Sequence, residues 1–332
     1  MNTIPLRGLA ILGVAATLTL SACGSSSDVT TGANGASDIK LAGVLANTSD
    51  PFWASIVCGA QGEADKRGVK LTMYTSTSAD DNETASNFQT ATLEKPDGML
   101  VNPFNGQQFI GQYKQLMQDG VPVVTATGTE PRTEYQTIFS DFNTAPFAKE
   151  IAAVIPKGAG SMLFMGGAPG IPPLEGRTKP FVEALAQARP DLNRLEDEFS
   201  GFDTNKATTD VASTIIANKD LKLIIAATGP DAVGAAAAVK QAGKQGDIAV
   251  IAFDAVPPEV AALKEGTIDV LIAQNPFAIG REQVSALVDY LEGDATGPVP
   301  TTAEPLGISS KVLTAATVDD PENSDYVYKA SC

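Results

Sequence analysis

The chain has 332 residues with a formal net charge of −16, and 43% of its residues are hydrophobic, which is enough to give two domains a core each. An acidic surface repels phosphate backbones, so we expect no nucleic acid partner. The sequence contains no histidine, which excludes Ser-His-Asp and Cys-His nucleophilic sites and removes the commonest metal ligand.

Motifs of known enzymes are also missing from the sequence. The patterns G-x-S-x-G, G-x-x-x-x-G-K-[ST] and C-x-x-C do not occur. A glycosidase that uses carboxylates alone, or an enzyme that forms a Schiff base through lysine, would survive these exclusions, but the sequence offers a positive sign of neither. We therefore expect no catalytic residue, no cofactor and no metal site.

The first 38 residues have the pattern of an export signal followed by a linker. Arg7 precedes an apolar run from Gly8 to Leu20, which has the length of a signal-peptide core and is too short to span a bilayer. The run closes as Leu20-Ser21-Ala22-Cys23, which resembles the lipobox of bacterial lipoproteins, and a Ser/Gly-rich stretch follows. We predict a signal peptide over 1–22, a lipidated Cys23, a flexible tether over 23–38, and an extracytoplasmic protein anchored to the bacterial cell membrane.

Short β-rich runs then alternate with helical stretches in the first half of the chain. We expect helices over Phe52 to Arg67, which ends at Gly68, and around Phe109 to Met117, which ends at Gly120. The predicted strands are Ile39 to Leu45, Lys70 to Tyr74, Gly98 to Val101 and Val121 to Thr125. Strand, helix and strand repeated in this order predict a parallel sheet that is covered on both faces.

The second half repeats the alternation. Its predicted strands are Ser161 to Met165, Leu221 to Ala227, Ile248 to Phe253 and Val270 to Ala273. Its predicted helices are Thr178 to Ala188, Thr208 to Asn218, Val233 to Ala242 and Ile279 to Leu291. We expect an α/β protein with two doubly wound, Rossmann-like lobes joined by three hinge segments. The first lobe would take 39–142 and 276–303, and the second 143–275 and 304–332. Sheets of this kind bind ligands beyond the carboxyl ends of their strands, which predicts a site between the lobes.

From Ile39 to Leu313 the sequence resembles the type I periplasmic binding proteins of the ribose/galactose-binding family. The matching segments, in order, are Ser49-Asp50-Pro51-Phe52-Trp53, Gly98 to Pro103, Gly120 to Val124, Ser140-Asp141, Gly167 to Phe181, Gly201-Phe202-Asp203, Ala252-Phe253-Asp254 and Ile272-Ala273-Gln274. The resemblance implies a monomeric two-lobed clamp that closes on a monosaccharide or sugar alcohol. It also implies docking onto the membrane permease subunits of an ABC transporter.

The residues at the expected strand ends suit a molecule with many hydroxyl groups. Sugars present apolar faces ringed by hydroxyls, so a good site combines flat rings with groups that donate and accept in pairs. The flat rings would be Phe52, Trp53 and Phe202. Arg177 would donate in a fork and Asp254 would accept, while Asn102 and Gln274 would do both. Truncating Arg177 or Asp254 to alanine is expected to abolish ligand binding without changing the melting temperature of the free protein.

Structural roles remain open for several of these residues. Trp53 could be an ordinary core anchor, and Asn102 and Asp254 could cap the helices that follow them. Asp50 lies on the same loop as Phe52 and is a further candidate. Asp141 could contact the ligand or brace the hinge.

Two positions depart from the ribose-type pattern. Thr127-Gly128 replaces an Asp-Arg pair, and Thr228-Gly229 replaces an Asn-Asp pair. Thr127 and Thr228 remain candidate ligand contacts, with one hydroxyl each in place of two polar or charged side chains. A hydrogen bond to a charged group contributes about 1.5 to 3 kcal/mol. We infer that the ligand is a smaller or less hydroxylated molecule than ribose, such as a short sugar alcohol or a deoxy sugar.

Two cysteines remain once Cys23 is assigned to a lipid. Cys58 and Cys332 could form a disulfide in an oxidising compartment, or could remain two separate thiols, and their spacing in the sequence does not decide between these.

The alternative functions start with a sensing lipoprotein of the same fold, which would present its bound sugar to a membrane receptor. A transcription regulator of related architecture would need an N-terminal DNA-binding helix pair and basic charge, and the sequence has neither. The remaining alternative is an enzyme acting on carbohydrates.

Overall fold

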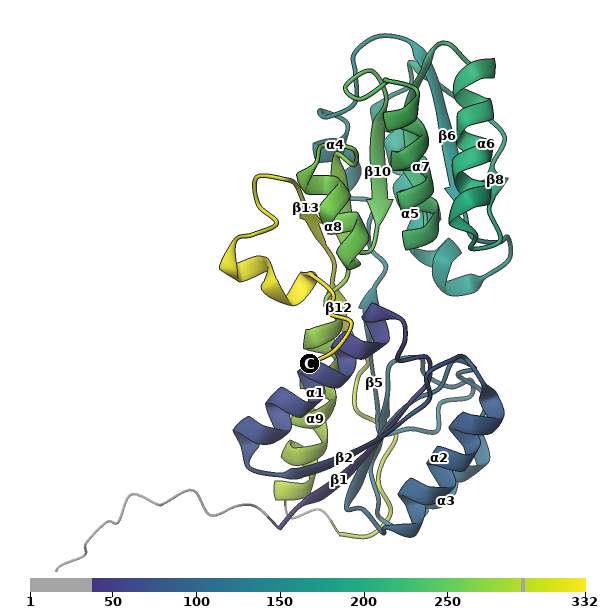
Figure 1. Ribbon diagram of the computed structural model, residues 1–332. Helices are drawn as coiled ribbons and strands as arrows, with labels where there is room; N and C mark the ends of the chain where they lie inside the picture. Colours follow the sequence, from purple (N-terminus) through teal and green to yellow (C-terminus); the bar gives the residue numbers. More distant parts are fainter. Residues whose placement is uncertain (1–37, 294–295) are drawn as a thin grey trace, which may run out of the picture. The chain divides into compact units, whose positions relative to one another are not determined.

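The computed structural model describes residues 38–293 and 296–332 (Figure 1). The predicted signal peptide and Cys23 lie outside these residues. Over the described part of the chain, none of the helices combines the length and apolar character that a membrane crossing requires. Two separate sheets organise this part, and each forms the centre of one lobe.

The first lobe is built on a six-stranded sheet with the strand order β12-β5-β4-β3-β1-β2, and all its pairings are parallel. Helices α1 and α9 cover one face with one apolar cluster, and α2 and α3 cover the other (Figure 1). Its strands are β1 (Lys40–Leu45), β2 (Lys70–Thr75), β3 (Gly98–Asn102), β4 (Val123–Thr125), β5 (Gln136–Asp141) and β12 (Leu306–Ser309). Its helices are α1 (Pro51–Arg67), α2 (Asp81–Leu93), α3 (Ile110–Gln118) and α9 (Pro276–Glu292).

The second lobe has a sheet in the order β13-β11-β10-β9-β6-β7, with β8 paired to β6 and only β13 antiparallel. Helices α6, α7 and α8 pack on one face, and α4 and α5 on the other. The strands are β6 (Gly160–Gly166), β7 (Leu192–Arg194), β8 (Glu198–Phe199), β9 (Leu221–Ala226), β10 (Ala249–Phe253), β11 (Val270–Ala273) and β13 (Lys311–Leu313). The helices are α4 (Phe147–Ile151), α5 (Pro172–Ala188), α6 (Thr204–Ala217), α7 (Gly229–Gln241), α8 (Pro257–Lys264) and the 3-10 helix η1 (Pro321–Tyr326).

The structure corrects one predicted lobe boundary. Strand β12 pairs with β5 in the first sheet, whereas the sequence placed everything after residue 303 in the second lobe. The last crossing between the lobes therefore falls at Ser310, between β12 and β13. Three of the four residues of β12 are exposed at the sheet edge, so the strand has no buried apolar pattern to reveal it.

Helix α5 also begins earlier than the sequence predicts. Pro172 and Pro173 occupy its first turn, whereas the predicted helix begins at Thr178. Proline is well tolerated there because its missing N–H has no partner inside the helix, and its fixed φ suits the helix. Arg177 is consequently held on a helix, with its backbone fixed by the turns on either side.

Helices α1 and α9 pack backbone against backbone and fix one face of the first sheet. A Cβ atom at Gly59 would lie 2.0 Å from the carbonyl oxygen of Phe277. A Cβ atom at Gly280 would lie 2.0 Å from the carbonyl oxygen of Ile56. Only glycine permits this approach, and α1 thereby holds in place Phe52 in its first turn and its N-cap residue Asp50.

The replacement Gly280→Ala should lower the free energy of unfolding by about 3 kcal/mol, since the backbones of α1 and α9 must separate to admit a methyl group. Gly62 lies on an exposed turn of α1, where an added Cβ atom would have no neighbouring atom within 4 Å. Gly62→Ala should therefore raise the free energy of unfolding by about 0.5 to 1 kcal/mol. Urea unfolding followed by circular dichroism measures both. Equal effects of the two substitutions would contradict the close packing of the helices.

Candidate functional site

An ion pair between the buried Arg177 and the partly buried Asp254 lies at the strand ends of the second lobe. Nη1 of Arg177 donates to Oδ1 of Asp254 at 2.6 Å, and Nη2 donates to Oδ2 at 2.8 Å. Nη2 also donates to the backbone carbonyl of Ala227 at 2.9 Å, just beyond β9. Burial disfavours the charge of Arg177, which is 6% exposed, but the Asp254 carboxylate outweighs this and raises the pKa of Arg177 above its ordinary value. The planar fork is therefore fixed and electrically balanced.

Two further residues complete the surroundings of Asp254. Nε2 of Gln274 donates to its Oδ1 at 2.8 Å, and the hydroxyl of Tyr328 donates to the same oxygen at 3.2 Å. The Tyr328 hydroxyl accepts in turn from the backbone N–H of Gln274 at 3.2 Å. Asp254 has a φ of 82°, a left-handed conformation that costs a non-glycine residue free energy. These hydrogen bonds stabilise Asp254 in that conformation.

The network leaves hydrogen-bonding capacity for a ligand. A carboxylate oxygen can accept about two hydrogen bonds, and from the described residues Oδ2 of Asp254 accepts only the one from Arg177. Nε of Arg177 is buried and has no partner within the described residues. The group thus keeps one acceptor position and one donor unused, and a hydroxyl group can both donate and accept a hydrogen bond.

A second network fixes the ring of Phe202. The Asp231 carboxylate accepts from the hydroxyls of Thr228 and Ser200, so the Ser200 oxygen is free to accept from the backbone N–H of Phe202 at 3.0 Å. Phe202 has a φ of 65°, and its ring lies over Gly167, where a Cβ would come within 2.3 Å of it. Its side chain remains 48% exposed. The second lobe thereby presents a flat apolar surface, which Ser200 and Gly167 hold in place on its buried side.

The first lobe contributes Asp50, Phe52 and Trp53 at the start of α1. Asp50 caps the helix by accepting from the backbone N–H of Phe52 at 2.9 Å. The ring of Phe52 lies 5.4 Å from that of Trp53 and 5.8 Å from that of Tyr328, measured between centroids. Burial raises the pKa of Asp50 above its ordinary value, and the nearby negative charge of Asp254 raises it further. Asp50 and Asp254 are therefore within electrostatic reach of each other although they belong to different lobes.

Asn102 is engaged inside the first lobe. Its side chain is fully buried, exchanges two hydrogen bonds with Gln283 on α9, and accepts from the backbone N–H of Ala126 at 2.7 Å. This pairing braces the first sheet against α9, and it occupies both acceptor positions of the Asn102 oxygen and one of its two N–H groups. Asn102 and Asp254 do not cap helices, since the N-cap residues are Phe109 for α3 and Val256 for α8.

Thr127 and Asp141, two further predicted residues, make local contacts in the first lobe and at its boundary. Thr127 is exposed after β4, and its hydroxyl is 3.2 Å from that of Thr125. Asp141 ends β5 at the first crossing between the lobes, where its carboxylate accepts from the backbone N–H of Asn143 at 3.0 Å. That contact braces the hinge segment. Across the described residues, no cluster of three or more Cys, Asp or Glu side chains is placed to hold a metal ion.

Glu259 is a carboxyl group near the site that the sequence did not reveal. It is fully buried, its Oε2 accepts from the backbone N–H of Val256 at 2.9 Å, and its Oε1 has no partner in the described part of the chain. Burial raises the pKa of Glu259 well above its ordinary value, and the negative charge of Asp254 adds to the effect. Tyr328 was also missed, because it lies in a tail without any helical or strand periodicity.

The raised pKa of Glu259 makes a testable difference to stability. The unfolded chain releases this proton near the ordinary glutamate pKa of about 4.3, whereas the folded protein retains it to higher pH. The contribution of Glu259 to the free energy of unfolding is therefore fully present below the pKa that Glu259 has in the unfolded chain. It is lost as the pH rises through the higher pKa that Glu259 has in the folded protein. Glu259→Gln, which preserves the cap to Val256, should remove this loss and raise the melting temperature at pH 8 above that of the wild type.

Melting temperatures measured from pH 4 to 8 give the comparison. The matched control is Glu265→Gln at the end of the same helix, where the side chain is exposed and paired with Lys240. It should follow the wild-type pH dependence. If the melting temperatures of Glu259→Gln and the wild type depended on pH in the same way, the raised pKa of Glu259 would be contradicted.

Comparisons with known proteins agree with the fold. Residues 41–295 match the family model described as periplasmic binding protein domain. The ribose import binding protein RbsB of Salmonella typhimurium is 28% identical over 80% of this chain and 89% of its own length. The fructose import binding protein FruE of Bifidobacterium longum is 23% identical over 93% of this chain and 94% of its own.

Solved structures give the same result. An ABC transporter solute-binding protein from Agrobacterium vitis, bound with α-D-tagatopyranose, superimposes with a TM-score of 0.70 at 26% identity. The match covers 88% of this chain and 99% of that one. The sugar-binding protein of a sugar ABC transporter from Bacillus halodurans has a TM-score of 0.77 at 18% identity, over 85% and 99% of the two chains, which shows the shared fold.

Proposed function

This chain belongs to the periplasmic binding protein domain family, and from that membership we propose that it is the extracytoplasmic substrate-binding protein of an ABC importer. It captures a monosaccharide or sugar alcohol between its lobes and delivers it unchanged to the permease. The observation that carries the proposal is the Arg177–Asp254 pair, which keeps one donor and one acceptor position unused in the lobe that also presents the exposed ring of Phe202. A fixed polar fork and a flat apolar surface suit the hydroxyls and the carbon face of one sugar.

The charges of the site favour a neutral ligand. Arg177 is the cation of this group, and its charge is already balanced by Asp254. Asp50 and Glu259 add further carboxyl groups near that pair. A sugar phosphate or a uronic acid would bring another negative charge into this acidic group without a free cation to meet it. Neutral sugars and polyols avoid that cost.

Two threonines, Thr228 and Thr127, stand where ribose-type relatives have polar or charged pairs, which supports a ligand with fewer hydroxyls than ribose. The hydroxyl of Thr228 donates to Asp231 at 2.5 Å, so it is engaged inside the lobe. Ribose-type relatives carry an amide and a carboxylate at this position and the next, and Thr127-Gly128 likewise stands in place of a charged pair. The chain thus offers fewer polar contacts than those relatives do. A short sugar alcohol or a deoxy sugar fits a site with this smaller number of polar side chains.

A panel of D-ribose, D-fructose, D-fucose, xylitol and erythritol tests the proposal by thermal shift. A ligand at 100 times its dissociation constant adds about 2.7 kcal/mol of stability, which raises the melting temperature by several degrees. At least one neutral member should do so, while ribose 5-phosphate and glucuronate should not. A shift with the anionic compounds alone, or with none of the compounds, would overturn the proposal.

Phe202→Ala is the cleanest variant for that screen. Its exposed ring can be removed with little effect on the free protein, and loss of the flat surface should weaken binding of the panel sugar about tenfold. Ile216→Ala, an exposed apolar residue on α6 of the same lobe, is the control and should bind like the wild type.

Alanine at Arg177 or Asp254 is a poorer choice than the sequence suggested. The structure revises the expectation that such variants keep the melting temperature of the free protein. Each truncation leaves its partner charge buried and uncompensated, which costs about 3 to 5 kcal/mol. Lost binding in these variants would be mixed with lost stability.

Membrane attachment through Cys23 forms part of the same proposal and rests on the lipobox pattern in the sequence. When the full chain is expressed in a bacterium with radiolabelled palmitate, the label should enter the protein and the protein should sediment with membranes. Cys23→Ser should lose both properties. Equal labelling of the two proteins, or release of both into the soluble fraction, would exclude the lipid anchor.

A further inference from the structure

The C-terminal residues 314–332, called the strap below, begin in the second lobe and are packed into it. They follow β13, the edge strand of the second sheet. Val318 and Tyr328 are buried in the apolar cluster that α6, α7 and α8 form on that sheet. The backbone N–H of Tyr328 donates to the carbonyl of Ala255 at 3.1 Å, immediately after Asp254. The strap is therefore part of the second-lobe core as far as Tyr328.

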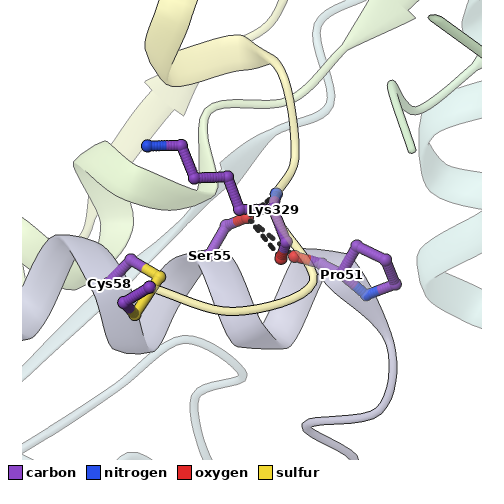
Figure 2. The surroundings of a disulfide bond; sticks show 5 residues. Pro51, Ser55, Cys58 and Lys329 are labelled. Carbon is purple, nitrogen blue, oxygen red and sulfur yellow. Dashed lines mark hydrogen bonds between the residues drawn. A yellow bond between two sulfur atoms is a disulfide. The ribbon is translucent and has the colours of Figure 1, made fainter. Parts of the chain in front are cut away.

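The end of the strap is attached to the first lobe. Cys332 forms a disulfide with Cys58 on α1, and the two Cα atoms are 5.3 Å apart (Figure 2). One turn earlier on α1, the hydroxyl of Ser55 accepts from the backbone N–H of Lys329 at 2.8 Å and donates to the carbonyl of Pro51 at 2.7 Å. The bridge is the first of the two alternatives that the sequence left open for these cysteines.

Helix α9 of the first lobe holds the strap as well. Arg281 donates to Asp325 at 2.9 Å, and the ammonium group of Lys329 lies 5.0 Å from the ring centroid of Phe277. Both pairs are partly exposed and contribute less than the covalent bond. They show that the strap contacts both helices, α1 and α9, on this face of the first lobe.

The free length of the strap between its two attachments is short. Four peptide units lead from Tyr328 in the second-lobe core to Cys332 on α1. A fully extended chain spans at most about 3.6 Å per residue, so this stretch can reach about 14 Å. The disulfide is thus a covalent link between the lobes in addition to the three chain crossings, and it limits how far the start of α1 can move away from Tyr328.

Tyr328 makes this link relevant to the binding site. Its hydroxyl donates to Oδ1 of Asp254 and accepts from the backbone N–H of Gln274. Its ring meets that of Phe52, which packs against apolar clusters of both lobes. One side chain therefore touches the acceptor of the second lobe and the aromatic group of the first.

We propose that the strap belongs to the binding apparatus: Tyr328 positions Asp254 and Phe52 for the ligand, and the Cys58–Cys332 bond keeps Tyr328 in that position. The inference rests on the proposed function and adds a positioning residue and a redox-sensitive anchor to it. Reduction by a dithiol breaks the S–S bond with two electrons and two protons, giving two cysteine thiols and the oxidised cyclic disulfide of the reagent. Ligand affinity should fall as a result.

The affinity test uses three variants and calorimetry with the panel sugar that gives the largest thermal shift. Tyr328→Phe, which keeps the ring, and Cys332→Ser should each weaken binding about tenfold. Tyr326→Phe removes a hydroxyl from the same strap away from Asp254, and it should stay within about twofold of the wild type. Dithiothreitol should weaken the wild type to the level of Cys332→Ser and leave that variant unchanged.

A role limited to stability would give a different result. In that case Tyr328→Phe and reduction would lower the melting temperature while the dissociation constant stayed within about twofold, and this outcome would overturn the proposal. A dithiothreitol effect that persists in Cys332→Ser would also overturn it.

A second measurement needs no ligand and separates this inference from the proposed function. Hydrogen–deuterium exchange of the peptide containing Gln274 should be at least about tenfold faster in Tyr328→Phe than in Tyr326→Phe, because the Gln274 N–H loses a well-positioned acceptor. If no panel sugar binds, the proposed function fails, and this exchange rate still decides the positioning role. Equal exchange in the two variants would refute that role.

Discussion

The site depends on the ion pair between Arg177 and Asp254. A buried guanidinium is stable only beside a compensating charge, and the carboxylate that compensates it comes from the loop immediately after β10. The carbonyl of Ala227 after β9 and the amide of Gln274 after β11 complete the set. Neighbouring parallel strands end at the same edge of the sheet, so the strand order of the second lobe itself brings these groups together.

That dependence explains which parts could be predicted from the sequence. Buried parallel strands are continuous apolar runs, so most strands of both sheets are recognisable, and residues directly after them fall at the site. Asp254 and Gln274 directly follow β10 and β11 and were predicted in this way, whereas Arg177 lies on α5 and was predicted through the resemblance. Phe202 was found through the resemblance, although the Asp231 and Ser200 contacts that hold it could not be seen from the sequence.

The features that the sequence did not reveal have a different physical origin. Asn102 also follows a strand, but whether its amide faces a ligand depends on Gln283, which lies 181 positions further along the chain. Strand β12 is short and exposed, and the strap has no periodic pattern. A pairing such as Cys58 with Cys332, which are separated by 274 positions, depends on the folded arrangement and not on any local signal. Contacts between residues that are far apart in the sequence therefore could not be predicted, and only the structure shows them.

The most direct test of the neutral-sugar site uses its one natural probe. Trp53 is the only tryptophan of the chain and lies beside Phe52 at the start of α1. Titration with a neutral sugar or polyol should therefore change the tryptophan fluorescence in a saturable way, while ribose 5-phosphate should leave it unchanged. A saturable response to the phosphate alone, or no response to any neutral sugar, would contradict the account.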